Sequence, residues 1–225
     1  ICWSVNDRYR VSKYIDRAMS LSEKTELATF NATAMLFELG DLSGVDNASS
    51  SIDESALQHP NFRYCFAFIE LANNNYEKGL PLAESRYEMS EAYRYMRSEL
   101  FSKPRWNKEC ISNKILLIHG EQGLGDMIQT ARYFNYCLES AKKVIIECPH
   151  ESIALLQYNF PTATFFPLSD KPLELHFDIW VGTLSLPYIF DTTCATIPGR
   201  GGYLNIPQDH RNYWKNRADE LGAEN

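Results

Sequence analysis

Hydrophobic positions follow different patterns in the two halves of the chain. In the first hundred residues, apolar side chains recur at helical spacing between short polar breaks, as from Leu27 to Leu39 and again from Phe62 to Leu71. In the second half, short apolar runs rich in β-branched residues alternate with helical stretches. The pattern predicts an all-α region followed by an α/β region.

The second half has the element order of a layered α/β domain. Apolar runs predict strands at residues 114–119, 144–148, 163–166 and 177–181. Helical spacing predicts helices at residues 126–137, 151–158 and 210–225. The order βαβαββ indicates the beginning of a Rossmann-like, doubly wound parallel sheet.

The composition indicates the class of protein, and one loop-like segment indicates a domain boundary. The 225 residues are 44% hydrophobic and 23% charged, which is typical of a globular protein. We place the boundary at the loop-like Pro104-Arg105-Trp106, giving a helical region 1–103 and an α/β domain 104–225. No run approaches the roughly 20 apolar residues of a membrane helix. Six scattered cysteines without a CxxC pair predict reduced thiols in a cytosolic protein and no zinc site.

The net charge of -7 argues against a nucleic-acid partner, which normally meets a basic face. The charge is unevenly distributed, with an acidic run at residues 20–57 and a basic run at residues 94–114. Each run is typical of a solvated face. The basic run alternatively forms a rim that attracts an anionic substrate.

The segment Gly120-Glu121-Gln122-Gly123-Leu124-Gly125-Asp126 joins the first predicted strand to the following helix. Glycines there allow a sharp turn and the close approach of a ligand, and ligands of such sheets bind beyond the carboxyl ends of the strands. The candidate ligand-binding residues are Glu121, Gln122, Gly123, Leu124, Gly125, Gln129, Arg132 and Ser185.

Three side chains in or beside this segment have two interpretations each. Asp126 is either an ordinary helix N-cap or a functional carboxylate. Arg132 either pairs with a phosphate or carboxylate of a ligand or braces Glu121 or Asp178. His119, at the end of the first strand, is either a proton carrier or, as we favour, a hydrogen-bonded structural residue.

The same turn has a dinucleotide-binding alternative. Gly123 and Gly125 supply two glycines of G-x-G-x-x-G, and Glu147 lies near the place of a ribose-binding acid. Ile128 occupies the third glycine position, which disfavours this alternative. No Gly-Lys-Ser/Thr follows the turn, so a Walker loop is excluded.

The segment from Gly120 to Tyr133 resembles the G-E-Q-G-L-G-D-x-I-Q-x-x-R-Y signature of bacterial tetratricopeptide proteins that carry a family-nine, heptosyltransferase-like glycosyltransferase domain. Further likenesses are the P-x-W at 104–106 and an S-L-P, I-P and Y-L series between 185 and 204. The two helical stretches of the first half align at an offset of 34 residues, the tetratricopeptide period.

This resemblance implies the N-terminal, acceptor-side half of a GT-B fold, with Asp126 as the general base. It implies transfer of a sugar from a nucleotide-activated donor to a glycan or lipid-linked acceptor, in the cytoplasm or at the inner membrane. No motif calls for a metal or a cofactor. We expect the donor domain to follow residue 225 and these residues alone to be inactive.

A different class stays open. The helical region is alternatively a tetratricopeptide-type module that binds a protein partner, beside a Rossmann-like domain without catalytic activity. Such arrays normally need about three repeats to build a groove, and the sequence offers one clear copy and one degenerate copy.

Overall fold

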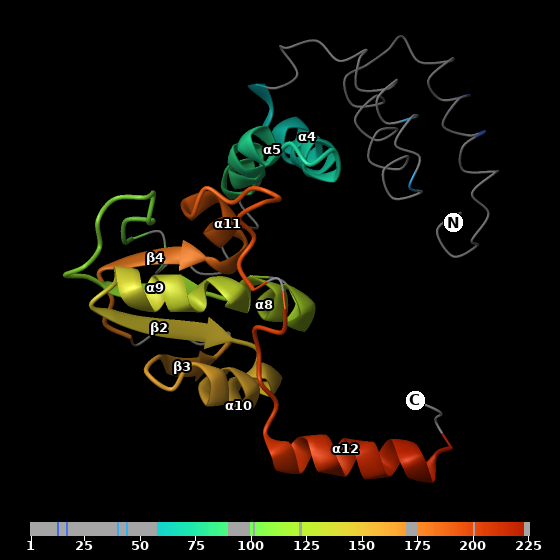
Figure 1. The fold of residues 1–225 in the computed structure, drawn as a ribbon. Helices are drawn as coiled ribbons and strands as arrows, with labels where there is room; N and C mark the ends of the chain where they lie inside the picture. The colour runs from blue at the N-terminus through green and yellow to red at the C-terminus, as the bar shows by residue number, and fades with distance from the viewer. Residues whose placement is uncertain are drawn as a thin grey trace. The chain divides into compact units, whose positions relative to one another are not determined.

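The computed structural model describes residues 13, 17, 40, 44, 58–89, 100, 102–121, 123–169, 175–199 and 201–222 (Figure 1). The chain divides into two compact units, residues 1–93 and 94–225. The first copy of the expected repeat, Leu27–Leu39, lies outside the described residues.

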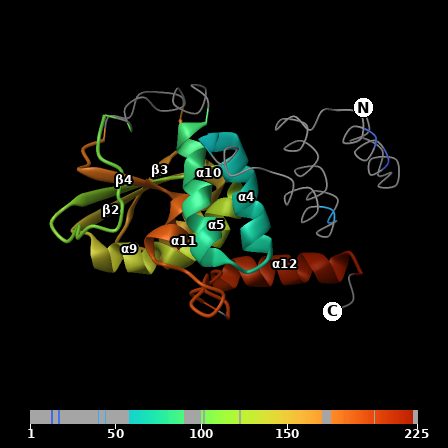
Figure 2. The same cartoon turned by 90° about the horizontal axis from the view of Figure 1, so that it is seen from above.

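The described part of the first unit is a pair of helices. These are α4 (Pro60–Ala72) and α5 (Tyr76–Ala83), which lie side by side in Figures 1 and 2 and are followed by the short 3₁₀ helix η3 (Glu84–Glu88). The two helices approach closely at Gly79, where an added Cβ would lie 2.7 Å from Cγ of Leu71. The helix pair agrees with the hydrophobic pattern, and its membership in a tetratricopeptide array stays a prediction.

The second unit is built on a four-stranded sheet in which all strands are parallel. Its strands are β1 (Ile115–His119), β2 (Lys143–Cys148), β3 (Thr164–Pro167) and β4 (Ile179–Gly182), in the order β3-β2-β1-β4. This confirms the predicted α/β class with a parallel sheet. The order is that of the first four strands of a doubly wound sheet. The chain adds β2 and β3 on one side of β1 and then returns to add β4 on its other side, so the strand order reverses between β1 and β4.

Helices follow strands β1, β2 and β4. They are α8 (Leu124–Thr130), η4 (Ala131–Tyr133), α9 (Phe134–Ser140), α10 (His150–Asn159), η5 (Thr183–Ser185), α11 (Leu186–Ile189) and α12 (Gln208–Glu220). The single helix predicted at 126–137 is interrupted by η4. The hydroxyl of Thr130 donates to the carbonyl of Asp126 at 2.8 Å, and such bonding back to the preceding turn bends helices.

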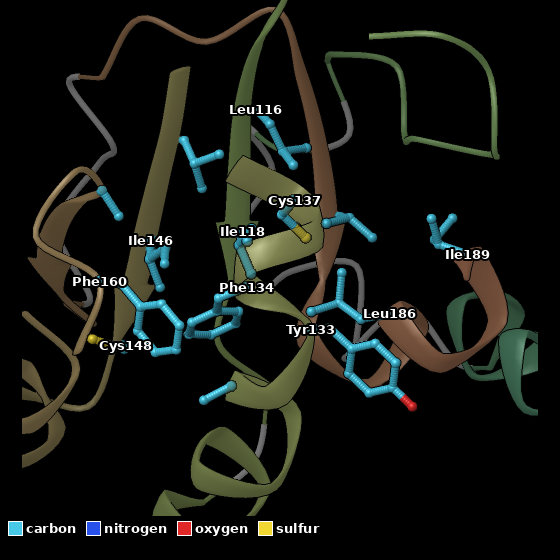
Figure 3. Close-up of a cluster of buried hydrophobic side chains, with 14 of the residues drawn as sticks. Leu116, Ile118, Tyr133, Phe134, Cys137, Ile146, Cys148, Phe160, Leu186 and Ile189 are labelled. Atoms are coloured by element: carbon cyan, nitrogen blue, oxygen red, sulfur yellow. The ribbon is translucent and has the colours of Figure 1, made fainter. Parts of the chain in front are cut away.

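The main core lies between the sheet and the helices that follow β1 and β2 (Figure 3). Alternate residues of β1, Leu116 and Ile118, pack there with Phe134 and Cys137 of α9. Leu117, which points to the opposite face of the sheet, is fully buried as well. Burial on both faces explains why the strands are continuous apolar runs rather than alternating ones.

Two tertiary contacts extend the second unit beyond the regular elements. Next to β4, the backbone N–H of Trp106 donates to the carbonyl of Trp180 at 2.7 Å, so the segment 104–106 is paired with the sheet rather than a free loop. Before α12, Asn205 N donates to Oδ1 of Asn159 at 2.7 Å, and Nδ2 of Asn159 returns a bond to the Asn205 carbonyl. None of the residues of α12 is buried.

Candidate functional site

The glycine-rich turn lies at the carboxyl edge of the sheet, beside the reversal of strand order between β1 and β4. Its first residue is fixed against β2, because Gly120 N donates to the carbonyl of Glu147 at 2.7 Å. A Cβ added to Gly120 would lie 2.7 Å from that carbonyl oxygen and 2.8 Å from Cε of Met127. Only glycine fits, so the turn is anchored to the strand beside it.

Asp126 lies in the first turn of α8 and is half-buried. The N-cap of α8 is Gly123, and Asp126 is the third helical residue. Its Oδ2 accepts a hydrogen bond from Gly123 N at 3.1 Å, as the acid of a capping box does. Asp126 is therefore not the N-cap considered from the sequence, although it does close the first turn of the helix.

The predicted ligand residues that are exposed form one short stretch. Gly123, Leu124, Gly125 and Gln129 are exposed beside the half-buried Asp126. An added Cβ at Gly125 meets no atom within 4 Å, so a ligand can reach the backbone there. Gln122 lies outside the described residues.

Two of the predicted ligand residues are buried instead. Glu121 is 5% exposed and joins the turn after β1 to the segment after β4. Its backbone N donates to Oγ1 of Thr183 at 3.2 Å, and its Oε2 accepts from Leu184 N at 3.1 Å. Ser185, in the same segment, is 1% exposed. Glu121 thus joins the two loops at the strand reversal. A ligand contact of Glu121 or Ser185 stays a prediction.

Arg132 is engaged by the loop that precedes α12. Its Nε donates to the carbonyl of Gln129 at 2.9 Å, and its Nη1 lies 3.5 Å from the carbonyl of Pro198. Its guanidinium lies 4.5 Å from the ring centroid of Tyr203, whose hydroxyl donates to Ile128 O at 2.9 Å. Arg132 thus contacts the loop before α12 rather than Glu121 or Asp178. Its pairing with a phosphate or carboxylate of a ligand stays a prediction.

His119 and Glu147 form a pair that the sequence did not connect. They are direct partners in the register of β1 and β2, and Nδ1 of His119 lies 2.8 Å from Oε2 of Glu147. Glu147 is fully buried. A buried carboxylate that is bonded to an imidazole is not presented to a ribose, which disfavours the dinucleotide alternative. Register, which no local pattern reveals, brings the two side chains together.

The described residues of the basic run have separate partners. Lys103 and Lys114 interact electrostatically with Asp178 at the amino edge, away from the glycine-rich turn. The backbone N–H of Ile115, donating to Asp178 Oδ2 at 2.8 Å, is the main reason that the pKa of this carboxyl is lowered. The described part of this run therefore forms no continuous rim around the turn.

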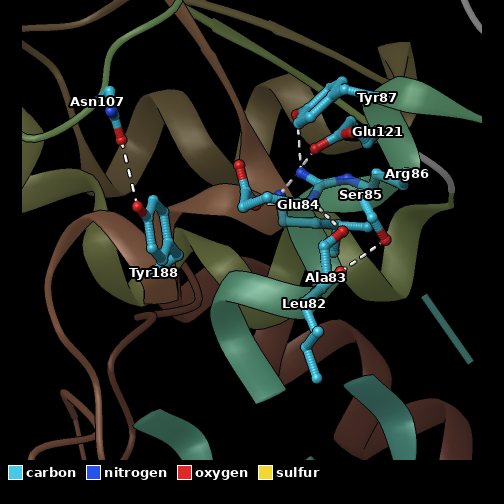
Figure 4. Close-up of polar contacts among 10 residues, drawn as sticks. Leu82, Ala83, Glu84, Ser85, Arg86, Tyr87, Asn107, Glu121 and Tyr188 are labelled. Atoms are coloured by element: carbon cyan, nitrogen blue, oxygen red, sulfur yellow. Dashed lines mark hydrogen bonds and ion pairs between the residues drawn. The ribbon is translucent and has the colours of Figure 1, made fainter. Parts of the chain in front are cut away.

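Lys108, from the same run, is paired locally. Its ammonium group forms an ion pair with Asp191 and lies 4.2 Å from the ring centroid of Tyr188. The Tyr188 hydroxyl in turn donates to Oδ1 of Asn107 at 3.3 Å (Figure 4). These contacts fix the segment before β1 against α11 and against Asp191, which follows it.

Two further properties bear on the chemistry of the second unit. Within the part of the chain that the structure describes, no group of three or more His, Cys, Asp or Glu side chains could hold a metal ion. No helix in that part is long and apolar enough to span a membrane.

Comparison with protein-family models, curated proteins and solved structures finds no match for this chain.

Proposed function

We propose that the chain is the acceptor-side part of a heptosyltransferase-like glycosyltransferase of GT-B architecture. Residues 1–103 would be a tetratricopeptide-like region and residues 104–225 the Rossmann-like N-terminal domain. The reaction would move a sugar from a nucleotide-activated donor, bound by a second domain, to a glycan or lipid-linked acceptor. A lipid-linked acceptor would place the protein at the cytoplasmic face of the inner membrane.

One observation carries the proposal. The segment that resembles the family signature, Gly120–Asp126, lies at the carboxyl edge of a parallel sheet and next to the reversal of strand order, where α/β proteins bind their ligands. There the exposed Gly123–Gly125 leave backbone accessible beside the Asp126 carboxylate. A sugar lying on these glycines would have a proton acceptor next to its hydroxyl groups.

Asp126 has the chemistry that the reaction needs. Its Oδ2 is held by the Gly123 N–H at 3.1 Å, which fixes the carboxylate in orientation. No donor among the described residues binds Oδ1, so this oxygen is left to accept a proton from an attacking hydroxyl. The carboxylate would thus serve both as part of the helix cap and as the general base.

The test is Asp126→Asn in the full-length protein, with release of nucleotide from a panel of UDP-, GDP-, ADP- and CMP-sugars as the readout. An asparagine Oδ1 still accepts from Gly123 N, so the turn keeps its shape while the base is lost. We expect kcat to fall about 10²- to 10⁴-fold, the usual contribution of a general base.

The matched control is Asp209→Asn, because Asp209 is an exposed acid in the first turn of α12. This control should transfer sugar at the wild-type rate. An Asp126→Asn protein that also does so would remove Asp126 as the base. A wild-type protein that releases nucleotide from none of the donors would remove the proposed function itself.

A further inference from the structure

The His119–Glu147 pair is a built feature at the same edge of the sheet. His119 is the last residue of β1 and directly precedes Gly120, the start of the candidate site. Its register partner Glu147 is the penultimate residue of β2. Both side chains lie on the face opposite to Leu116 and Ile118, because successive residues of a strand alternate between faces.

The exposure of the two partners is unequal. Glu147 is fully buried, whereas the side chain of His119 is 12% exposed. A buried carboxylate is costly unless it is hydrogen-bonded, and the 2.8 Å contact with Nδ1 supplies such a bond. The imidazole is therefore held at Nδ1 by a buried anchor, while part of the His119 side chain stays exposed.

The contact also sets the chemistry of the ring. In a neutral imidazole one nitrogen donates and the other accepts. A carboxylate can only accept, so Nδ1 must carry the proton that it donates to Glu147. Nε2 is then a hydrogen-bond acceptor, and none of the described residues donates to it. The arrangement is that of a carboxylate that orients a histidine toward a ligand.

We propose that Nε2 of His119 binds a hydroxyl group of the acceptor sugar, and that Glu147 is the positioning residue that fixes its orientation. This inference rests on the proposed function and adds to it, because it assigns acceptor recognition to His119 and leaves proton removal to Asp126. An oriented acceptor nitrogen favours a ligand that places a hydroxyl group opposite it, since a site that bonds a hydroxyl rejects the analogue that lacks it.

The decisive variant is His119→Asn. The asparagine Nδ2 takes the place of the imidazole Nδ1 and can still donate to Glu147, so the buried carboxylate stays paired. Nothing replaces Nε2. A residue with a purely structural role would tolerate this change, whereas a ligand-binding residue would not.

Kinetics of the full-length protein with methyl glycosides as acceptors separate the two roles. His119→Asn should raise KM for the acceptor about 10- to 100-fold, the worth of one strong hydrogen bond, and change kcat little. His176→Asn, an exposed histidine near Asp178 at the amino edge, is the matched control and should leave KM unchanged. An unchanged KM in His119→Asn, with activity still lost in Asp126→Asn, would overturn the inference and leave the proposed function standing.

A measurement without substrate tests the geometry separately. Long-range ¹H–¹⁵N NMR of the histidine-labelled protein, above the titration range of the imidazole, should show the tautomer with Nδ1–H at His119. The tautomer with Nε2–H would overturn the inference even if sugar transfer is observed. If no donor is used by the wild-type protein, the proposed function fails, while this spectrum still decides whether Nε2 is available as an acceptor.

Discussion

Replacing Gly120 with alanine should destabilise the second unit, whereas replacing Gly125 should not. An added Cβ at Gly120 would lie 2.7 Å from the backbone oxygen of Glu147 and 2.8 Å from Cε of Met127. The methionine is fully buried, and the oxygen belongs to β2 and already accepts from Gly120 N. The backbone oxygen in particular cannot move without disturbing the β1–β2 pairing.

The expected magnitude follows from these contacts. Overpacking of a tight interior costs about 1–3 kcal/mol, and a clash with backbone belongs in the upper part of that range. Gly125→Ala meets no atom within 4 Å and lies in the first turn of α8. Alanine is the better helix former by about 0.5–1 kcal/mol, so this variant should be as stable as the wild type or more stable.

Urea unfolding followed by tryptophan fluorescence measures both variants. Trp106 and Trp180 are buried in the second unit and report on its unfolding. With a urea slope of about 1–3 kcal/mol per M, a loss of about 2 kcal/mol lowers the midpoint of Gly120→Ala by roughly 1 M. A Gly120→Ala protein that unfolds at the wild-type urea concentration would refute the close approach of the turn to β2.

Two further predictions concern titratable groups in the second unit. The hydrogen bond from Ile115 N lowers the pKa of Asp178 below 3.8. The stabilisation by the ionised Asp178 is therefore present above pH 3.8 and is lost as the pH falls through the lowered pKa. The difference in urea midpoint between wild type and Asp178→Ala should shrink correspondingly below about pH 4, and a constant difference would contradict this. Burial raises the pKa of the Cys137 thiol, whereas a hydrogen bond with Ser112 lowers that of the exposed Cys110. Iodoacetamide should therefore label Cys110 in the native protein and Cys137 only after unfolding, and peptide mass spectrometry that finds native Cys137 labelled would count against the buried position.

The elements of the second unit were readable from local pattern because each strand is a short apolar run between turn residues. Lys114–His119 was predicted as a strand and is β1, Ile115–His119. The break in the helix after β1 was missed, since apolar spacing continues through it. In the structure the Thr130 hydroxyl bonds back to the carbonyl of Asp126 just before the break, a contact that often bends helices. The segment 104–106 looked like a free loop because its pairing partner, Trp180, is distant in the chain.

In the candidate site, too, some features follow from the sequence and others only from the tertiary structure. The position of the turn and the closeness of Asp126 to its glycines follow from their adjacency in sequence. The burial of Glu121 and Ser185 does not, since it depends on the loop after β4 being folded against the turn after β1. Position in the sequence therefore suggested these two residues as ligand contacts, whereas their burial is a result of tertiary packing.

By itself, then, the sequence determined the α/β class, the elements and the turn at which a ligand is expected, because hydrophobic period and turn chemistry are local properties. The strand order, the register that pairs His119 with Glu147, and the contact of Arg132 with Pro198 were decided by the tertiary structure. These contacts join residues 28 and 66 positions apart. They depend on how whole helices and strands pack their apolar faces together. The residues that neighbour each partner in the chain therefore do not indicate these contacts.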